Sequence, residues 1–296
     1  MATVSEWNNA AARPDVFNTK NRARRHAIGL LLIRRWFLAS IILLVLSLLI
    51  PTNASAQGFG PRAFQLVPEN TNVLALYGYL LDGNRAVDPS VVIQGADIDI
   101  DLAVLQYSRA FAIKGNQAGI YGIVSAGQVD GAVDLGGMAL SDSNSGFGDI
   151  QIGATFGVIG SPSLSLEEYV KFKPAFSAGI LTLFTLPTGQ YDESHALNLG
   201  TNRWAAQLGT VLLWYQGDTL LDPRLRTFEL VPSFTFYGDN DDPFGANSTE
   251  QSAMFKLEGH ITQNINQAMF LSADAFYTYG GETTTDGVNN NDKQSA

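Results

Sequence analysis

Beyond residue 57, apolar and polar side chains alternate with a period of two over long stretches of the chain. In residues 147–158, Ile150 and Ile152 share one face while Asp149 and Gln151 share the other. Successive side chains of a β-strand point to opposite faces, so this alternation is typical of strands between two different environments. The same pattern recurs in residues 97–102, 227–237 and 253–264.

The pattern predicts nine long strands and only one short helical candidate, residues 163–171. The strands span residues 71–81, 97–112, 117–130, 147–159, 173–185, 203–216, 225–237, 253–264 and 268–280. Each strand is about 10–16 residues long, against roughly five or six in the sheets of soluble proteins. A strand of this length can cross a bilayer at the usual tilt.

The connections between these strands alternate in length. Those after the second, sixth and eighth strands are short, and the one after the fourth (160–172) is intermediate. The long, polar connections span residues 82–96, 131–146, 186–202 and 238–252. Outer-membrane barrels have long extracellular loops and short periplasmic turns, so this rhythm favours a membrane barrel over a soluble sandwich.

Two tryptophans mark the ends of one predicted strand. Trp204 and Trp214 are ten residues apart, so their side chains share a face. Ten residues at about 3.3 Å each, tilted by about 40°, rise roughly 25 Å, the height of the apolar band between two aromatic girdles. The pair is therefore predicted to be membrane girdle residues; the alternative is a pair of core tryptophans in a long soluble strand.

Nine strands that begin in the periplasm would leave the last one ending outside the cell. A bacterial single-chain barrel needs an even number of strands and a closed seam, because an open edge in lipid leaves backbone groups unpaired. The expected fold is therefore all-β, an antiparallel transmembrane β-barrel of about 12 strands when complete. On this interpretation the chain lacks about the last one to three strands.

The N-terminal region predicts export. An apolar run at residues 36–50 follows Arg34 and Arg35, and an Ala-Ser-Ala sequence ends at Ala56. This order predicts a signal peptide over residues 28–56, cleaved after Ala56. An uncleaved anchor is the alternative, but the two arginines interrupt the stretch of about 20 apolar residues that a spanning helix requires. Residues 1–27 would be a leader or an over-long start, and residues 57–296 the incomplete barrel.

Charge and composition exclude several classes of protein. Of 18 basic residues, seven precede residue 36, which leaves 11 basic against 26 acidic residues from residue 57 onward. So acidic a region is not expected to bind nucleic acid. The chain has no cysteine, which excludes disulfides and thiol chemistry.

No constellation predicts an enzyme, a cofactor or a metal site. His195 lies in a polar loop and is expected to be solvated, with metal binding as the alternative. A barrel lipase would need a serine beside a histidine on the lipid side, whereas the alternation directs His260 inward. The acidic residues 239–242 could hold calcium through oxygen ligands. Their spacing is not that of an EF-hand, however, and a solvated loop is expected.

Polar rows on the inward faces of the strands are the candidates for setting solute selectivity. The alternative for each residue is a salt bridge that merely fills the barrel. The lumen-facing candidates are Asp97, Asp99, Asp101, Arg109, Lys256, Glu258, His260 and Asp274.

Five short segments in order also resemble a known family. They are Gly-Phe-Gly-Asp-Ile at 146–150, Leu-Pro-Thr-Gly-Gln-Tyr at 186–191, Asn-Leu-Gly-Thr-Asn-Arg-Trp at 198–204, Glu-Gly-His at 258–260 and Tyr-Gly-Gly-Glu-Thr at 279–283. Together they resemble the phenol-degradation meta-pathway family of outer-membrane β-barrels, often simply called transporters, from about residue 65 to the end. The chain departs from that family in its long leader and in lacking closing strands.

The resemblance implies passage of small hydrophobic or aromatic compounds. The expected function is therefore a passive outer-membrane channel whose partners are membrane lipid and such solutes. The alternative is a structural or adhesive outer-membrane barrel with a plugged lumen.

Overall fold

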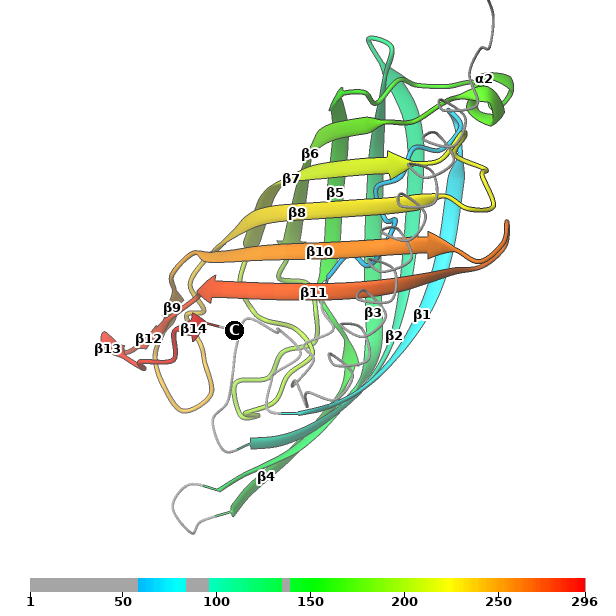
Figure 1. The fold of residues 1–296 in the computed structure, drawn as a ribbon. Helices are drawn as coiled ribbons and strands as arrows, with labels where there is room; N and C mark the ends of the chain where they lie inside the picture. The colour runs from blue at the N-terminus through cyan, green and yellow to red at the C-terminus, as the bar shows by residue number, and fades with distance from the viewer. Residues whose placement is uncertain (1–57, 84–95, 135–138, 296) are drawn as a thin grey trace, which may run out of the picture. The chain divides into compact units, whose positions relative to one another are not determined.

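The computed structural model describes residues 58–83, 96–134 and 139–295, so the predicted leader and signal peptide lie outside it. The described chain forms an 11-stranded antiparallel sheet in which strands follow one another in sequence order (Figure 1). Its strands are β1 (Asn72–Gly83), β2 (Ala96–Ile113), β3 (Asn116–Asp134), β4 (Ala139–Phe147), β5 (Ile150–Ile159), β6 (Phe176–Leu186), β7 (Ala205–Gln216), β8 (Arg226–Tyr237), β10 (Met254–Asn264), β11 (Phe270–Gly280) and β14 (Gln294–Ser295).

Smaller elements lie at the two ends of this sheet. At one end, α2 (Leu166–Lys171) connects β5 to β6 and begins at a capping box formed by Ser165 and Glu168. At the other end a three-stranded sheet joins the short strands β9, β12 and β13 (Figure 1). These strands span Thr249–Gln251, Thr283–Thr285 and Val288–Asn289. Within the described residues, no helix is both long and apolar enough to span a membrane.

All nine predicted strands are present, and so is the short helix. The prediction of a loop over residues 131–146 is wrong, because β3 continues to Asp134 and pairs with β4 from Asp134↔Ala139 to Ala126↔Phe147. The sequence of β4 contains Ser-Asp-Ser-Asn-Ser, which shows no apolar alternation and therefore resembles a polar loop. The resulting β3–β4 hairpin extends beyond the neighbouring strands (Figure 1).

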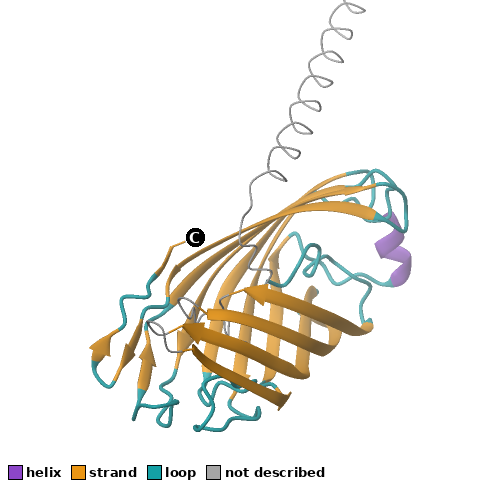
Figure 2. Cartoon of the chain, turned by 90° about the horizontal axis from the view of Figure 1, so that it is seen from below, coloured by secondary structure: helices purple, strands orange, loops and turns teal. Residues whose placement is uncertain are grey.

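Strand register assigns every side chain of the sheet to one of two faces. The sheet curves into a half-barrel (Figure 2), bounded by β1, which pairs with β2, and by β11 with the short β14. We call the inner side the lumen face. The outer face carries exposed apolar side chains on every long strand from β2 to β10, including Leu105, Ile120, Ile152, Ile180, Leu208, Phe234 and Ile261.

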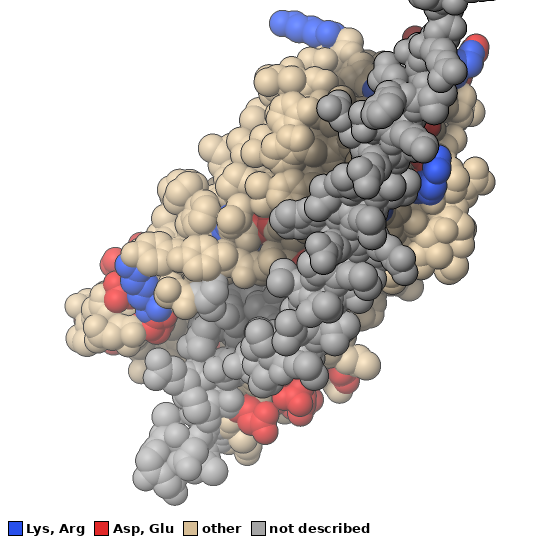
Figure 3. Space-filling model, in the orientation of Figure 1, with Lys and Arg blue, Asp and Glu red and all other residues tan. Residues whose placement is uncertain are grey.

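This distribution differs from that in a soluble domain. The lumen face buries Glu229, Glu258 and His260 completely, while large apolar residues face outward. Over β6–β8 the outer surface is largely uncharged, and charged side chains gather nearer the ends of the molecule (Figure 3). An apolar outer band and a polar interior are what a transmembrane barrel requires. By the loop-length rule, the end with α2 is periplasmic and the end with β4 and β9 is extracellular.

Both tryptophans lie on the outer face. Trp204 is 60% exposed and Trp214 is 40% exposed. Trp214 packs between Phe176 and Phe228 of the neighbouring strands, with ring centroids 5.1 Å and 5.4 Å away. A soluble core would bury these rings, so their placement supports the girdle interpretation over the core interpretation.

Fluorescence can test the depth of these tryptophans. In Trp204→Phe and Trp214→Phe variants, which each retain one member of the pair, we expect quenching by lipid-bound quenchers near the headgroups to exceed quenching by bilayer-centre quenchers. The reason is that indole rings prefer the interface between lipid headgroups and hydrocarbon to the bilayer centre. Predominant quenching of either ring by an aqueous quencher would contradict a girdle position.

Candidate functional site

The inward faces of three adjacent strands bring charged residues together. Register places His260 of β10 opposite both Glu229 of β8 and Asp274 of β11. Glu258 and Lys256 lie two and four positions before His260 in β10, so their side chains share its inward face. Register thus places Lys256, Glu258, His260 and Asp274 on the same, inward face of the sheet.

These side chains contact one another. His260 Nδ1 lies 2.7 Å from Asp274 Oδ1, and Lys256 Nζ lies 2.8 Å from Glu258 Oε1. His260 Nε2 lies 3.7 Å from Glu258 Oε2. The side chains of Glu258 and His260 are fully buried, whereas that of Asp274 remains 32% exposed. Buried charges require such partners, since an isolated charge away from water is very costly.

Residues 58–69, which we call the N-terminal segment, lie against this charged row. The backbone N–H of Phe59 donates to Glu258 Oε2 at 2.9 Å, and that of Arg62 donates to Glu229 Oε2 at 3.1 Å. Arg62 Nε also donates to Thr262 Oγ1 at 2.8 Å. The segment therefore satisfies two buried carboxylates that the strands alone would leave with fewer partners.

The N-terminal segment crosses the interior of the half-barrel. The Phe59 ring lies 6.3 Å from the ring of Tyr121 on β3, although the same residue is bonded to β10. Four strands separate β3 from β10 in the sheet, so this contact spans the lumen. Farther along, the N–H groups of Val67 and Glu69 donate to Gln117 Oε1 and the Leu164 carbonyl near the periplasmic end.

An apolar cluster fills the interior beside the charged row. Leu66 of the N-terminal segment is 3% exposed and packs on inward residues of β6, β7 and β8, with Phe59 and Phe64 against the same cluster. The wall residues of this cluster are Leu181, Val211, Leu213, Tyr215 and Val231. The N-terminal segment shows no period-two alternation, so the sequence pattern predicts no role for it. The apolar residues of this segment, among them Phe59, Phe64, Leu66 and Val67, are the available signal in the sequence.

A second cluster of contacts, which we call the Asp149 assembly, lies at the extracellular end. There the carboxylate of Asp149 accepts four hydrogen bonds. Oδ1 accepts from the N–H groups of Thr188 and Gly189 at 3.0 Å and 2.7 Å. Oδ2 accepts from the N–H and hydroxyl of Thr201 at 2.8 Å and 2.6 Å. A Cβ on Gly189 would lie 2.7 Å from Gly200 Cα, so the two glycines permit close backbone contact. Three of the five segments that carry the family resemblance thus meet at one carboxylate.

Residues 187–204, which we call the mouth loop, fold onto the inward face of β2 and β3. Leu197 and Leu199 are 4% and 2% exposed and form a cluster with Ile98, Ile100 and Val129. The mouth loop therefore narrows the extracellular end of the lumen.

Four predicted lumen residues are placed differently. Register puts Asp97, Asp99, Asp101 and Arg109 on the outer face of β2, so the prediction that they face the lumen is wrong. The alternation was correct, but the apolar side of residues 97–102 packs inward on the mouth loop instead of outward on lipid. The three aspartates are consequently exposed at the extracellular end of the strand.

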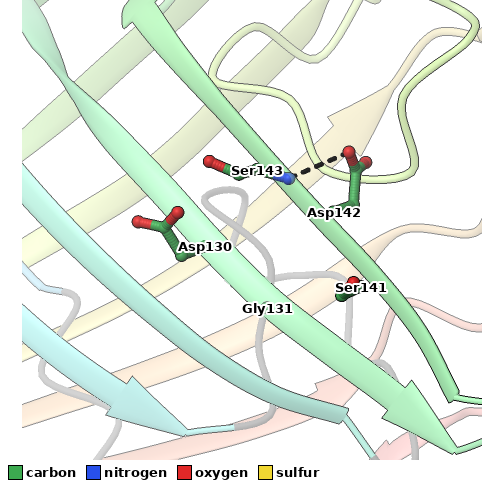
Figure 4. A pocket seen from close by; sticks show the side chains of 5 residues that line it. All are labelled: Asp130, Gly131, Ser141, Asp142 and Ser143. Atoms are coloured by element: carbon green, nitrogen blue, oxygen red, sulfur yellow. Dashed lines mark hydrogen bonds between the residues drawn. The ribbon is translucent and has the colours of Figure 1, made fainter.

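The sequence predicts that His195 of the mouth loop is solvated, but in the structure its side chain contacts a carboxylate. Its Nδ1 lies 2.7 Å from Oδ1 of Asp142 on β4, and the other oxygen of Asp142 accepts the N–H of Leu197 at 2.9 Å. Asp142 also lines an open, polar hollow between β3 and β4, where it accepts the N–H of Ser143 (Figure 4). Among the described residues, which include the predicted calcium alternative at 239–242, no group of His, Asp and Glu could hold a metal ion.

The contact of His195 with β4 should depend on pH. The hydrogen bond to Asp142 raises the pKa of His195 above its ordinary value, which is about 6.5. The contact is therefore at full strength below that ordinary value and weakens as pH rises through the raised pKa. We expect protease cleavage within the mouth loop to accelerate over about pH 6–9.

The matched control for this pH effect is Asp142→Asn, compared with the unaltered protein at each pH. Removing the carboxylate should abolish the pH dependence that remains after the protease's own profile is subtracted. An equal pH dependence in both proteins would show that another group controls the loop.

The half-barrel, the apolar outer band and the charged interior define the fold of an outer-membrane channel. The chain is similar to the crystal structure of an outer membrane channel from Pseudomonas putida F1, with a TM-score of 0.64 and 20% identity over 80% of this chain and 82% of that one. The predicted outer-membrane location agrees with this fold.

Residues 81–296 match the family described as "Putative MetA-pathway of phenol degradation", and the chain belongs to that family. The predicted resemblance is thereby confirmed. No curated protein sequence matches the chain.

Proposed function

We propose that this protein is a passive outer-membrane channel for small hydrophobic or aromatic compounds and has no catalytic role. The observation that carries the proposal is the composition of the lumen face, where the charged row of β8, β10 and β11 adjoins the apolar cluster of β6–β8. Such a wall offers apolar contact to a ring and polar contact to its substituents. The selectivity role of Lys256, Glu258, His260 and Asp274 forms part of the proposal.

The N-terminal segment favours the second candidate, a structural or adhesive barrel with a plugged lumen. It occupies the space between β3 and β10 and buries apolar side chains there. A permanently fixed segment would block solutes altogether. The two candidates therefore differ in whether the segment leaves the lumen.

Uptake by intact cells separates the candidates. We expect cells that lack the protein to take up radiolabelled toluene more slowly than cells that contain it, because the lipopolysaccharide leaflet resists hydrophobic solutes. The protein in planar bilayers should also pass ion current. Equal uptake rates would contradict a hydrophobic substrate, and the absence of current from correctly folded protein would favour the structural barrel.

A further inference from the structure

The N-terminal segment contacts the lumen wall in the way that a bound solute would. Within the described chain, the hydrogen bonds that join residues 58–66 to the wall run to side chains, chiefly Glu258, Glu229 and Thr262. The segment adds no strand to the sheet. It can therefore leave without disrupting any ladder of backbone hydrogen bonds.

The fit of the segment to the wall is close at one point. A Cβ on Gly58 would lie 2.3 Å from Glu258 Oε2 and 2.4 Å from a ring carbon of Phe276. Side chains larger than glycine would therefore push this part of the segment away from the carboxylate.

The wall keeps polar atoms that the segment does not satisfy. Glu229 is fully buried, and its Oε1 has no hydrogen-bond partner among the described residues. The same is true of Nε2 of the fully buried His260. A buried acceptor without a donor is unfavourable, so a ligand with an additional N–H donor would complete the site better than the segment does.

The charges of the wall indicate which ligands would do so. Glu229, Glu258 and Asp274 supply three carboxylates on adjacent strands, against the ammonium of Lys256 and the imidazole of His260. Arg62 brings a further positive charge with the segment, next to Glu229. Withdrawal of the segment removes that charge and leaves an acidic wall, which attracts cations and rejects anions.

The aromatic contacts indicate the rest of the ligand. The Phe59 ring packs edge-on against Phe64 with centroids 4.9 Å apart, and Lys256 Nζ lies 5.7 Å from its centroid. The ring packs among Phe64, Tyr121 and Lys256, beside the carboxylate that accepts the Phe59 N–H. A solute with a ring next to an N–H donor would reproduce this arrangement.

We propose that residues 58–66 are a removable plug seated on an acidic solute site, and that the site takes compounds with an aromatic ring beside a cationic or N–H donor group. This inference rests on the proposed channel function. It narrows the solute class and assigns a gating role to the N-terminal segment.

Ion current through the protein with residues 58–66 deleted tests the plug. We expect the deletion to raise single-channel conductance and to shift the reversal potential in a KCl gradient towards K⁺. Gly58→Val, which retains the full chain, should also raise single-channel conductance above that of the unaltered protein, but by less than the deletion does. Both variants should keep the heat-dependent gel shift of a folded barrel.

Block of that current by three probes of similar size tests the site. Benzylammonium should block the deletion variant at concentrations about tenfold lower than benzoate, with benzyl alcohol between them. Glu229→Gln or Glu258→Gln in the same background should remove most of this difference. Asp99→Asn, on the outer face of β2, is the matched control and should leave it unchanged.

The outcomes distinguish the two proposals. Unchanged conductance in both folded variants would overturn the plug while leaving a conducting channel in place. Equal block by benzylammonium and benzoate would overturn the acidic solute site. If neither the intact protein nor the deletion variant conducts although both are folded, the channel function itself fails.

Discussion

Replacing Leu257 with lysine is expected to destabilise the inserted barrel by about 2–4 kcal/mol. Leu257 lies on the outer face of β10, between the inward residues Lys256 and Glu258. An ammonium at this position would face hydrocarbon, where it has neither water nor a paired charge. The chain itself places a lysine one residue earlier, where the alternation directs it to Glu258 instead.

Urea unfolding in lipid vesicles, followed by the heat-dependent gel shift, measures this effect. Leu257→Ala is the matched control, because it removes the side chain without adding charge and should cost much less. Equal stability of Leu257→Lys and Leu257→Ala would mean that β10 does not present this face to lipid.

Replacing Asp149 with alanine is expected to release the mouth loop. The change removes the acceptor of four hydrogen bonds from Thr188, Gly189 and Thr201. Hydrogen bonds to a charged group contribute about 1.5–3 kcal/mol each, so even partial compensation by water leaves a loss of about 3 kcal/mol or more. The barrel should remain folded, because its strand ladders do not include this carboxylate.

Cleavage of the mouth loop by a protease on intact cells measures this release. Asp149→Ala should be cut much faster than the unaltered protein, while the heat-dependent gel shift persists. Asp99→Ala, an exposed aspartate on the outer face of β2, should be cut at the unaltered rate. Slow cleavage of Asp149→Ala would show that the apolar contacts of Leu197 and Leu199 hold the loop without the carboxylate.

The strands and the charged row of β10 could be predicted from the sequence because both follow from local alternation. A period of two fixes which residues share a face, and Lys256, Glu258 and His260 lie on one face of β10. Alternation alone does not identify the face that meets lipid, however. For β2 the sequence pattern predicts that the polar face turns to the lumen, whereas it is the apolar face of Ile98 and Ile100 that turns inward. That face meets Leu197 and Leu199, about 100 residues later in the chain.

The N-terminal segment and the Asp149 assembly could not be predicted for a related reason. Phe59 and Glu258 are 199 residues apart, and Asp149 and Thr201 are 52 apart, without a shared local pattern. Their contacts depend on the curvature of the sheet, which brings strands far apart in sequence around one lumen. β4 was missed because its polar residues resemble a loop when considered alone.

Two threonine-to-cysteine variants test most directly whether the inward face lines a solute path, because the chain has no cysteine of its own. Thr235 of β8 faces inward opposite Gln207, whereas Thr210 of β7 faces outward opposite Ile180. A charged, membrane-impermeant thiol reagent should reduce the current through Thr235→Cys channels in planar bilayers and leave Thr210→Cys channels unchanged. If Thr235→Cys is fully labelled without loss of current, or if Thr210→Cys is blocked instead, this face does not line the path.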